Sequence, residues 1–372
     1  MTECVTGLDL VELQLRVAAG EPLPITQDDV SFDGHAIEVR LVAEDPTAGW
    51  LPSTGTIDVF EIGEGVRVDT GVRSGSVVSP DYDSLLAKVI GHATTREHAS
   101  RRLARALRTS WVAGVHTDAN ALVAILGDAD FLAADTPTSF LTEHPELTEA
   151  TGPGGADRTA LLLGAVFSRE HRNRAADPVT GFAPSGWRNL RTRGQRERWA
   201  APGDETQHVE YERRGDGASV LLGPWPCPTE DGSLSTDERQ RVEVRFGDRR
   251  PDRQVLEIDG IRHVVDVWSD DHVVHVRSPA GAATFEMEPR FVPPSAAAAT
   301  GGPTSPLPGK VLSVHVAAGA TVSDGDVLVV VEAMKMEHAI TAPGDAVVEE
   351  VCFAEGDRVD AGDLLVRLEV PE

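Results

Sequence analysis

Apolar and polar positions alternate with different periods along the chain, and these periods predict its elements. Residues 9–19 place leucines and valines among polar residues at helical spacing, and residues 95–107 repeat this pattern with arginines on the outer face. Residues 35–43 (HAIEVRLVA) are apolar at every second position instead, which is typical of a half-buried strand. Residues 1–147 are therefore predicted to mix helices and strands.

Residues 156–290 are predicted to form one helix followed by several short strands. The expected helix, residues 156–174, has an apolar face made of Leu161, Leu162, Ala165 and Val166. Residues 255–259 and 262–268 are predicted strands, joined by Asp259–Gly260, a strong signal for a two-residue hairpin turn. Short strands at this spacing indicate a small antiparallel β-barrel or a sandwich.

The last part of the chain contains an internal repeat. It follows residues 291–305, a stretch of proline, alanine and glycine that we expect to be a linker. The pattern G-x-x-V-x-x-G-D-x-L-V begins at Gly319 and again at Gly356, 37 residues later. Neither copy can bury its apolar face alone, so residues 306–372 are predicted to close about a pseudo-twofold axis into a flattened all-β domain.

Between the two copies lies the segment Glu332-Ala-Met-Lys-Met-Glu-His338. We expect a segment that joins two halves of a symmetric β domain to form an exposed hairpin tip. This one holds two of the four methionines and one of only three lysines. Methionine is unbranched and adaptable, so Met334 and Met336 suit a lysine that is presented to another protein. If Lys335 is considered without its neighbours, the alternative is an ordinary solvated lysine in a turn.

Ala333-Met334-Lys335-Met336, with its flanking repeats, resembles the biotinyl domain of biotin-dependent carboxylases. The resemblance implies that a biotin protein ligase attaches biotin covalently to Lys335, within a motif that also includes Glu332. Lipoyl domains share this fold, but they resemble Asp-Lys-Ala at the tip, which disfavours lipoate here. A biotin on a mobile domain would make the transfer between two active sites intramolecular, at a high effective concentration.

Residues 1–147 contain candidate site residues but no nucleotide-binding motif. Neither G-x-G-x-x-G nor G-x-x-x-x-G-K occurs anywhere in the chain. Arg40 lies in the alternating strand among acidic neighbours, which leaves open a structural ion pair or a functional cation. Asp81 and Asp83 are either a carboxylate pair or part of a solvated turn after Pro80.

Several stretches of residues 1–147 resemble the C-terminal region of biotin carboxylase. They are residues 2–11 (TECVTGLDLV), 34–40 (GHAIEVR), 43–45 (AED), 51–55 (LPSTG), 82–84 (YDS) with Lys88, 114–117 (GVHT) and 138–141 (TSFL). The resemblance implies a catalytic role for Arg40, which would face the ureido group of biotin and stabilise its enolate. A fixed cation beside a developing oxyanion is a sound electrostatic device.

In that family the ATP-grasp module lies upstream of the residues that match Thr2 and Glu3. We therefore expect ATP, Mg²⁺ and bicarbonate to be used only through a missing part or a partner, so this chain alone should not carboxylate biotin. The hypothesis is a late start within the reading frame of a longer subunit, and a natural split subunit is the alternative.

The middle part resembles the domain that docks the carboxyltransferase β subunit in acyl-CoA carboxylase α subunits. Gly186-Trp187-Arg188 and the closing hairpins carry this resemblance. Residues 171–174 (HRNR) are either a contact patch or a solvated helix end, and Trp187 and Trp268 are either interface anchors or core. The resemblance implies a hetero-oligomer whose β subunit binds the acyl-CoA.

The order of the parts distinguishes between carboxylase classes. It resembles the α subunit of acetyl-, propionyl- or 3-methylcrotonyl-CoA carboxylase, and it leaves no room for the transferase barrel expected in pyruvate carboxylase. Two other hypotheses are a non-catalytic biotinyl carrier or scaffold for separately encoded partners, and the carrier of a biotin-dependent decarboxylase.

Composition and charge disfavour other classes of partner. The 34 basic residues stand against 60 acidic ones, a formal charge of −26, which repels nucleic acid and anionic membrane surfaces. Cys4, Cys227 and Cys352 have no metal-ligand spacing, so we expect no metal site or disulfide framework and a reducing cytoplasm. The N-terminus is mixed and acidic, unlike a signal peptide, and the longest aliphatic run, Val327–Val331, is far shorter than the ~20 residues that cross a bilayer.

Overall fold

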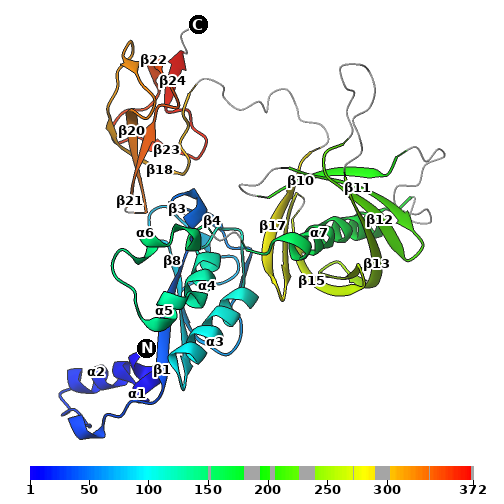
Figure 1. Ribbon diagram of the computed structural model, residues 1–372. Coiled ribbons are helices and arrows are strands. Elements are labelled where there is room, and N and C mark those ends of the chain that lie inside the picture. The colour runs from blue at the N-terminus through cyan, green and yellow to red at the C-terminus, as the bar shows by residue number, and fades with distance from the viewer. Residues whose placement is uncertain are drawn as a thin grey trace. The chain divides into compact units, whose positions relative to one another are not determined.

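The computed structural model describes residues 1–149, 152–179, 193–201, 206–225, 239–270, 272–289, 302–334 and 336–369. The chain divides into two compact units, which are described separately: Met1–Leu107 with Val112–Ala150 and Pro293–Glu372, and Arg108–Trp111 with Thr151–Val292 (Figure 1). Gly186–Arg188, Lys335 and most of the predicted linker lie outside the described residues. No helix in the described ranges is long and apolar enough to cross a membrane.

Residues 1–149 form a three-stranded antiparallel sheet with helices on one side. Its strand order is β1 (His35–Val42), β8 (Leu85–Ala93) and β6 (Arg67–Thr70). The core joins the inward side chains of β1 and β8, such as Leu41 and Val89, to Leu103 and Leu107 of α3 (Arg96–Thr109). The predicted strand and helices therefore form, and α2 (Leu10–Ala18) is the helix predicted over residues 9–19.

Short elements complete this part of the chain. They are α1 Thr2–Thr6, η1 Gln27–Asp29, β2 Glu44–Asp45, η2 Pro46–Ala48, β3 Leu51–Pro52, β4 Gly55–Thr56, β5 Val59–Glu61, β7 Val77–Val78, β9 Trp111–Ala113, α4 Ala119–Gly127, α5 Ala129–Ala133, α6 Phe140–Glu143 and η3 Pro145–Leu147.

The middle part is a closed antiparallel barrel of eight strands, which decides between the barrel and the sandwich that its pattern left open. Its strands are β10 Gln195–Ala200, β11 Gln207–Arg214, β12 Gly217–Leu222, β13 Gln240–Arg250, β14 Arg253–Ile258, β15 Ile261–Ser269, β16 Val273–Ser278 and β17 Gly281–Met287. The turn at Asp259–Gly260 forms as predicted. Both residues have positive φ, 51° and 78°, as a two-residue turn that matches the twist of the strands requires.

Helix α7 (Gly155–Ala176) packs against the strands β13 to β17 (Figure 1). All residues from Ala160 to Ser168 are buried, so the prediction of a single apolar face is wrong for the middle of this helix. A helix surrounded by a core must be apolar on every side, because no side chain faces water. Gly164 allows the close approach, since a Cβ there would lie 2.6 Å from Cγ1 of Val265.

Residues 302–369 fold into two facing β-sheets that exchange strands between the repeat copies. One sheet has the order β21-β20-β18-β23, and the other has the order β19-β22-β24. The strands are β18 Gly309–Val314, β19 Thr321–Val322, β20 Val327–Ala333, β21 Met336–Thr341, β22 Ala346–Val351, β23 Arg358–Val359 and β24 Val366–Glu369. Strand β18 of the first copy pairs with β23 of the second, and β22 pairs with β19, as the predicted pseudo-twofold axis requires.

Equivalent positions of the two copies have the same structural role. Val322 and Val359 are both 3% exposed within one core. Gly325 and Gly362 both have a positive φ, 84° and 90°, where an L side chain is strained. The aspartate after each glycine accepts a backbone N–H from three residues upstream, at 2.8 Å and 2.7 Å. The repeat therefore encodes the same turn twice, and the fold class predicted for this part of the chain is confirmed.

The repeated turns give a test of this symmetry. We expect Gly325→Ala and Gly362→Ala each to destabilise the C-terminal domain by about 1–2 kcal/mol, because both impose a left-handed residue with a Cβ. Gly344→Ala is the matched control: its Cβ would meet no atom within 4 Å and its φ is not in the left-handed range. Hydrogen exchange of residues 302–369 in the full chain measures the stability of all three variants. A loss of stability in Gly344→Ala, with none in Gly325→Ala and Gly362→Ala, would contradict the symmetry.

Candidate functional site

The segment between the repeats forms the predicted hairpin. Strands β20 and β21 end on the pair Ala333 and Met336, which leaves Met334 and Lys335 as a two-residue connection. Met334 has a φ of 50°, the left-handed value that the first position of such a turn adopts. Lys335 lies outside the described residues. Its neighbours nevertheless show a tight turn between paired strands, which fits a lysine that an enzyme must reach and modify.

Acidic residues flank this turn on the paired strands. Glu332 lies opposite Glu337 on β21 and opposite Lys310 on β18. Like charges in direct cross-strand pairs are unfavourable, so Lys310 partly compensates for the Glu332–Glu337 pair.

Exposure varies among the side chains beside the turn. Ala333 and Met334 are 3% and 6% exposed, and Met336 is half-buried. Along β21 the burial alternates, with Met336, His338 and Ile340 more buried than their neighbours.

His338 is a residue of this site to which the sequence pattern assigned no role. Its Nε2 atom is buried and has no hydrogen-bond partner in the structure. Burial lowers the pKa of His338 below its ordinary value, because the charged imidazolium loses its hydration. The folded domain therefore favours the neutral form of this ring.

Arg40 lies on the polar face of the sheet formed by β1, β8 and β6. It is exposed and pairs across the strands with Lys88, which in turn lies opposite Asp69. Within the described residues Arg40 makes no ion pair, so the structural ion pair that the sequence left open does not form. Its acidic neighbours have other partners: Glu38 lies 3.8 Å from the amino group of Met1, and Glu44 accepts a hydrogen bond from Ser84.

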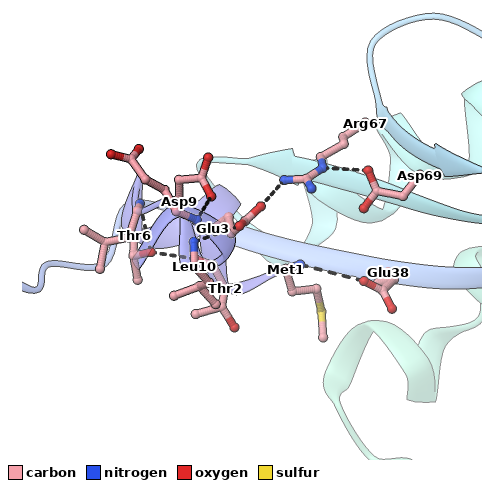
Figure 2. Close-up of polar contacts among 11 residues, drawn as sticks. Met1, Thr2, Glu3, Thr6, Asp9, Leu10, Glu38, Arg67 and Asp69 are labelled. Carbon is pink, nitrogen blue, oxygen red and sulfur yellow. Dashed lines mark hydrogen bonds and ion pairs between the residues drawn. The ribbon is translucent and has the colours of Figure 1, made fainter. Parts of the chain in front are cut away.

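Helix α1 is anchored beside this polar face by charged contacts. Figure 2 shows Arg67 of β6 between the carboxylates of Glu3 and Asp69, with Arg67 Nε 2.9 Å from Asp69. The hydrogen bonds from Arg67 and from the Leu10 N–H hold the pKa of Glu3 below its usual range. The Glu3 side chain thereby ties α1 to the start of α2.

The motifs that resemble biotin carboxylase converge near the end of β1, although they are far apart in the sequence. The backbone of Ala43 bonds to Ser84 and to Ser53, each at 2.8 Å, and the Ser53 hydroxyl accepts the His116 N–H at 2.9 Å. Asp118 accepts the Val42 N–H at 3.0 Å.

Asp118 is a second candidate residue that the sequence pattern did not reveal. Burial, with the nearby charge of Glu44, raises the pKa of the Asp118 carboxyl to about 7. Only the folded chain brings residues 42, 44 and 118 together, so no local signal could have identified it.

Asp81 and Asp83 belong to the solvated turn that was one of the two alternatives. Asp81 accepts a hydrogen bond from Ser79 at 2.9 Å, and Asp83 caps the Leu85 N–H at 3.1 Å. Tyr82 between them is 76% exposed.

In the barrel, the indole of Trp268 packs on the ring of His275, with centroids 5.2 Å apart. Trp187, the other tryptophan considered as an interface anchor, lies outside the described residues.

Two protein-family models match this chain. The model of the biotin carboxylase C-terminal domain matches residues 38–143, and the model of biotin-requiring enzymes matches residues 304–368. The chain therefore contains a biotin carboxylase C-terminal domain and a biotin-lipoyl carrier domain, and the latter indicates covalently bound biotin.

The homologues of the chain are acyl-CoA carboxylase α subunits. It is 30% identical to the mitochondrial methylcrotonoyl-CoA carboxylase subunit alpha of Mus musculus, over 100% of this chain and 52% of the relative. It is also 30% identical to the propionyl-CoA carboxylase alpha chain of Ruegeria pomeroyi, over 99% of this chain and 56% of that one. The chain thus spans about half the length of the relatives it matches, and these are subunits of multi-subunit ligases.

Among solved structures, the biotin carboxylase subunit of a pyruvate carboxylase is 44% identical over 40% of this chain and 33% of its own, with a TM-score of 0.39.

The buried ring of His338 predicts a pH dependence of stability. Its folded pKa lies below the unfolded value of about 6.5, so the unfolded state binds more protons as the pH falls through 6.5. We therefore expect the carrier domain to lose more stability between pH 7.5 and pH 5.5 than a His338→Gln variant does. Hydrogen exchange of β20 and β21 at both pH values measures this difference.

His315→Gln, which changes an exposed histidine of the same domain, is the control. It should keep the full pH dependence. An unchanged dependence in His338→Gln would show that this ring is not the titrating group.

Proposed function

We propose that this chain is the carrier and docking portion of an acyl-CoA carboxylase α subunit. It would carry carboxylate on a biotin held by Lys335, from an ATP-dependent biotin carboxylase site to a carboxyltransferase on a separate β subunit. The observation that carries the proposal is the tight turn around Met334 and Lys335, placed between two symmetric halves of a biotin-lipoyl domain. The homology to acyl-CoA carboxylase α subunits along the whole chain supports it.

Lys335 would provide the point of attachment, through an amide bond at Nζ. When bound, biotin supplies a ureido nitrogen that accepts and releases the carboxylate. Ala333, Met334, Met336 and Glu332 would form the surface that a biotin protein ligase recognises around the lysine. The flanking strands hold this surface in a fixed register, so that the ligase meets one conformation of the turn.

Arg40 would act at the biotin carboxylase site. It is an exposed cation without an ion pair in the described structure, and Lys88 lies beside it on the next strand. Two fixed cations on a sheet face favour negative charge that develops nearby. Arg40 would thus stabilise the enolate form of the ureido group.

The proposed domain boundaries follow the predicted ones. Residues 1–147 would be the biotin carboxylase C-terminal region, residues 156–290 the docking domain and residues 306–372 the carrier, with a linker over 291–305. The closed barrel of residues 195–287 and its buried helix α7 support an independently folded docking domain. This domain would bind the carboxyltransferase β subunit in a hetero-oligomer, in the cytoplasm.

The chain by itself should be inactive in ATP-dependent carboxylation. ATP, Mg²⁺ and bicarbonate would be bound by a biotin carboxylase part outside these residues or on another polypeptide. The alternatives of a pure scaffold and of a decarboxylase carrier are not favoured, because the homologues are carboxylase subunits.

Lys335→Arg tests the attachment site. We expect the variant, expressed in a host with an active biotin protein ligase, to lose all avidin binding and the mass of one biotinyl group. Arginine keeps the charge but cannot form the amide. Lys310→Arg, on a neighbouring strand of the same domain, should keep full avidin binding. Retained avidin binding by Lys335→Arg would refute the assignment.

ATP turnover tests the proposed dependence on another part. With ATP, Mg²⁺, bicarbonate and free biotin, we expect the purified chain to release no ADP above the rate without protein. A complete carboxylase α subunit serves as the positive control. ADP release that rises with free biotin would show that the chain holds its own ATP site.

A further inference from the structure

Arginine is distributed unevenly along this acidic chain. Residues 151–292 hold 20 of the 31 arginines and no lysine, against 23 acidic residues. The barrel part is therefore nearly neutral, whereas the rest of the chain carries almost all of the net charge of −26. An anionic group approaching this protein meets the least repulsion at the barrel.

One pocket on the outside of the barrel gathers several of these arginines. It has a volume of about 220 Å³ and lies over the start of β10 and the strands β11, β12 and β13. Its polar lining includes Arg193, Arg214, Arg241, Glu210, Glu212 and Ser219. We refer to it as the arginine pocket.

The two carboxylates that line this pocket, Glu210 and Glu212, are paired with arginines. Glu210 accepts hydrogen bonds from Arg239 at 2.7 Å and from Arg196 at 2.9 Å, and also binds the Gly194 N–H. Burial would raise the pKa of Glu210, but these three donors outweigh it and hold the pKa below its ordinary value. Glu212 pairs with Arg214 at 3.1 Å. Neither carboxylate therefore repels an incoming anion with its full charge.

Two arginines of the pocket remain available. Arg193 makes no hydrogen bond or ion pair in the described structure and is exposed. Arg241 is exposed too, and among the described residues its one hydrogen-bond partner is the hydroxyl of Ser219, at 3.0 Å. Ser219 is 5% exposed and donates to Glu243 at 2.7 Å, so one guanidinium edge of Arg241 is fixed while the other stays free.

We propose that the arginine pocket binds an oxyanion, either a carboxylate or a phosphate group. Arg193 and Arg241 would each donate a charge-assisted pair of hydrogen bonds, the geometry for which the guanidinium fork is suited. The ligand is a free phosphate or polycarboxylate, or an acidic side chain of a protein that docks on the barrel. The inference is independent of biotin, because no residue of the carrier domain takes part.

Isothermal titration calorimetry of the full chain at low ionic strength tests the proposal. The probes are inorganic phosphate, citrate and a hexaglutamate peptide, which distinguish a phosphate, a small polycarboxylate and an acidic protein segment. We expect saturable binding of at least one probe. In Arg193→Gln/Arg241→Gln its affinity should fall at least 10-fold, and in the double lysine variant, which keeps the charge but loses the fork, it should fall less.

Arg245→Gln/Arg262→Gln is the matched control, because it removes two exposed arginines from the same barrel outside the pocket. It should keep the affinity within about twofold. No saturable binding of any probe, an unchanged affinity in Arg193→Gln/Arg241→Gln, or an equal loss in the control would each overturn the proposal. The same variants should bind avidin normally. The test of oxyanion binding is therefore independent of the test of biotin attachment.

Discussion

Neither copy of the C-terminal repeat can bury its own apolar residues, so the two copies must exchange strands. β18 pairs with β23 and β19 with β22, and the shared core between them includes Leu328 and Leu365, both fully buried. This exchange fixes the ends of β20 and β21, and hence the two-residue turn that contains Met334 and Lys335. The carrier chemistry proposed for the lysine depends on this constraint, because a frayed hairpin would not present one defined turn to a ligase.

The eight-stranded barrel depends on a different constraint, a helix surrounded by strands. Apolar burial of α7 leaves its polar side chains without water, and each must find a partner inside. The side chain of Glu170 is 3% exposed and forms an ion pair with Arg249 at 2.7 Å. Arg169 of the same helix forms an ion pair with Glu197 of β10 at 2.9 Å, and Glu197 also accepts a hydrogen bond from the indole N–H of Trp199 at 3.0 Å. Such pairs add little net stability but penalise other registers, since an unpaired buried charge is costly.

The sheet of residues 1–149 has its charged side chains on one face, in contact with solvent, and not in its core. One face packs into the core with α3, and the other carries Arg40, Lys88 and the contacts that anchor α1 (Figure 2). Among the described residues Arg40 has no ion pair, and its neighbours Glu38 and Glu44 contact the amino group of Met1 and the Ser84 hydroxyl instead. An exposed cation that the local structure does not neutralise remains available for a ligand, which is consistent with the role proposed for it.

Local patterns in the sequence were enough to predict the main helices and strands, the repeat and the lysine between its copies. Such patterns are local: they include the helical and strand periods, the Asp259–Gly260 turn and the G-D turns of the repeat. Each can be recognised from residues that are close together in the sequence. The burial of individual side chains could not be predicted in this way, because it depends on which segments pack together in the fold. The burial of α7 on all sides, the lowered pKa of His338 and the raised pKa of Asp118 arise from contacts between residues that are distant in the sequence. The arginine pocket also needs the folded sheet, because pairing of the consecutive strands β10 to β13 brings residues 193, 214 and 241 together. A periodic pattern states which side chains share a face, but not what covers that face.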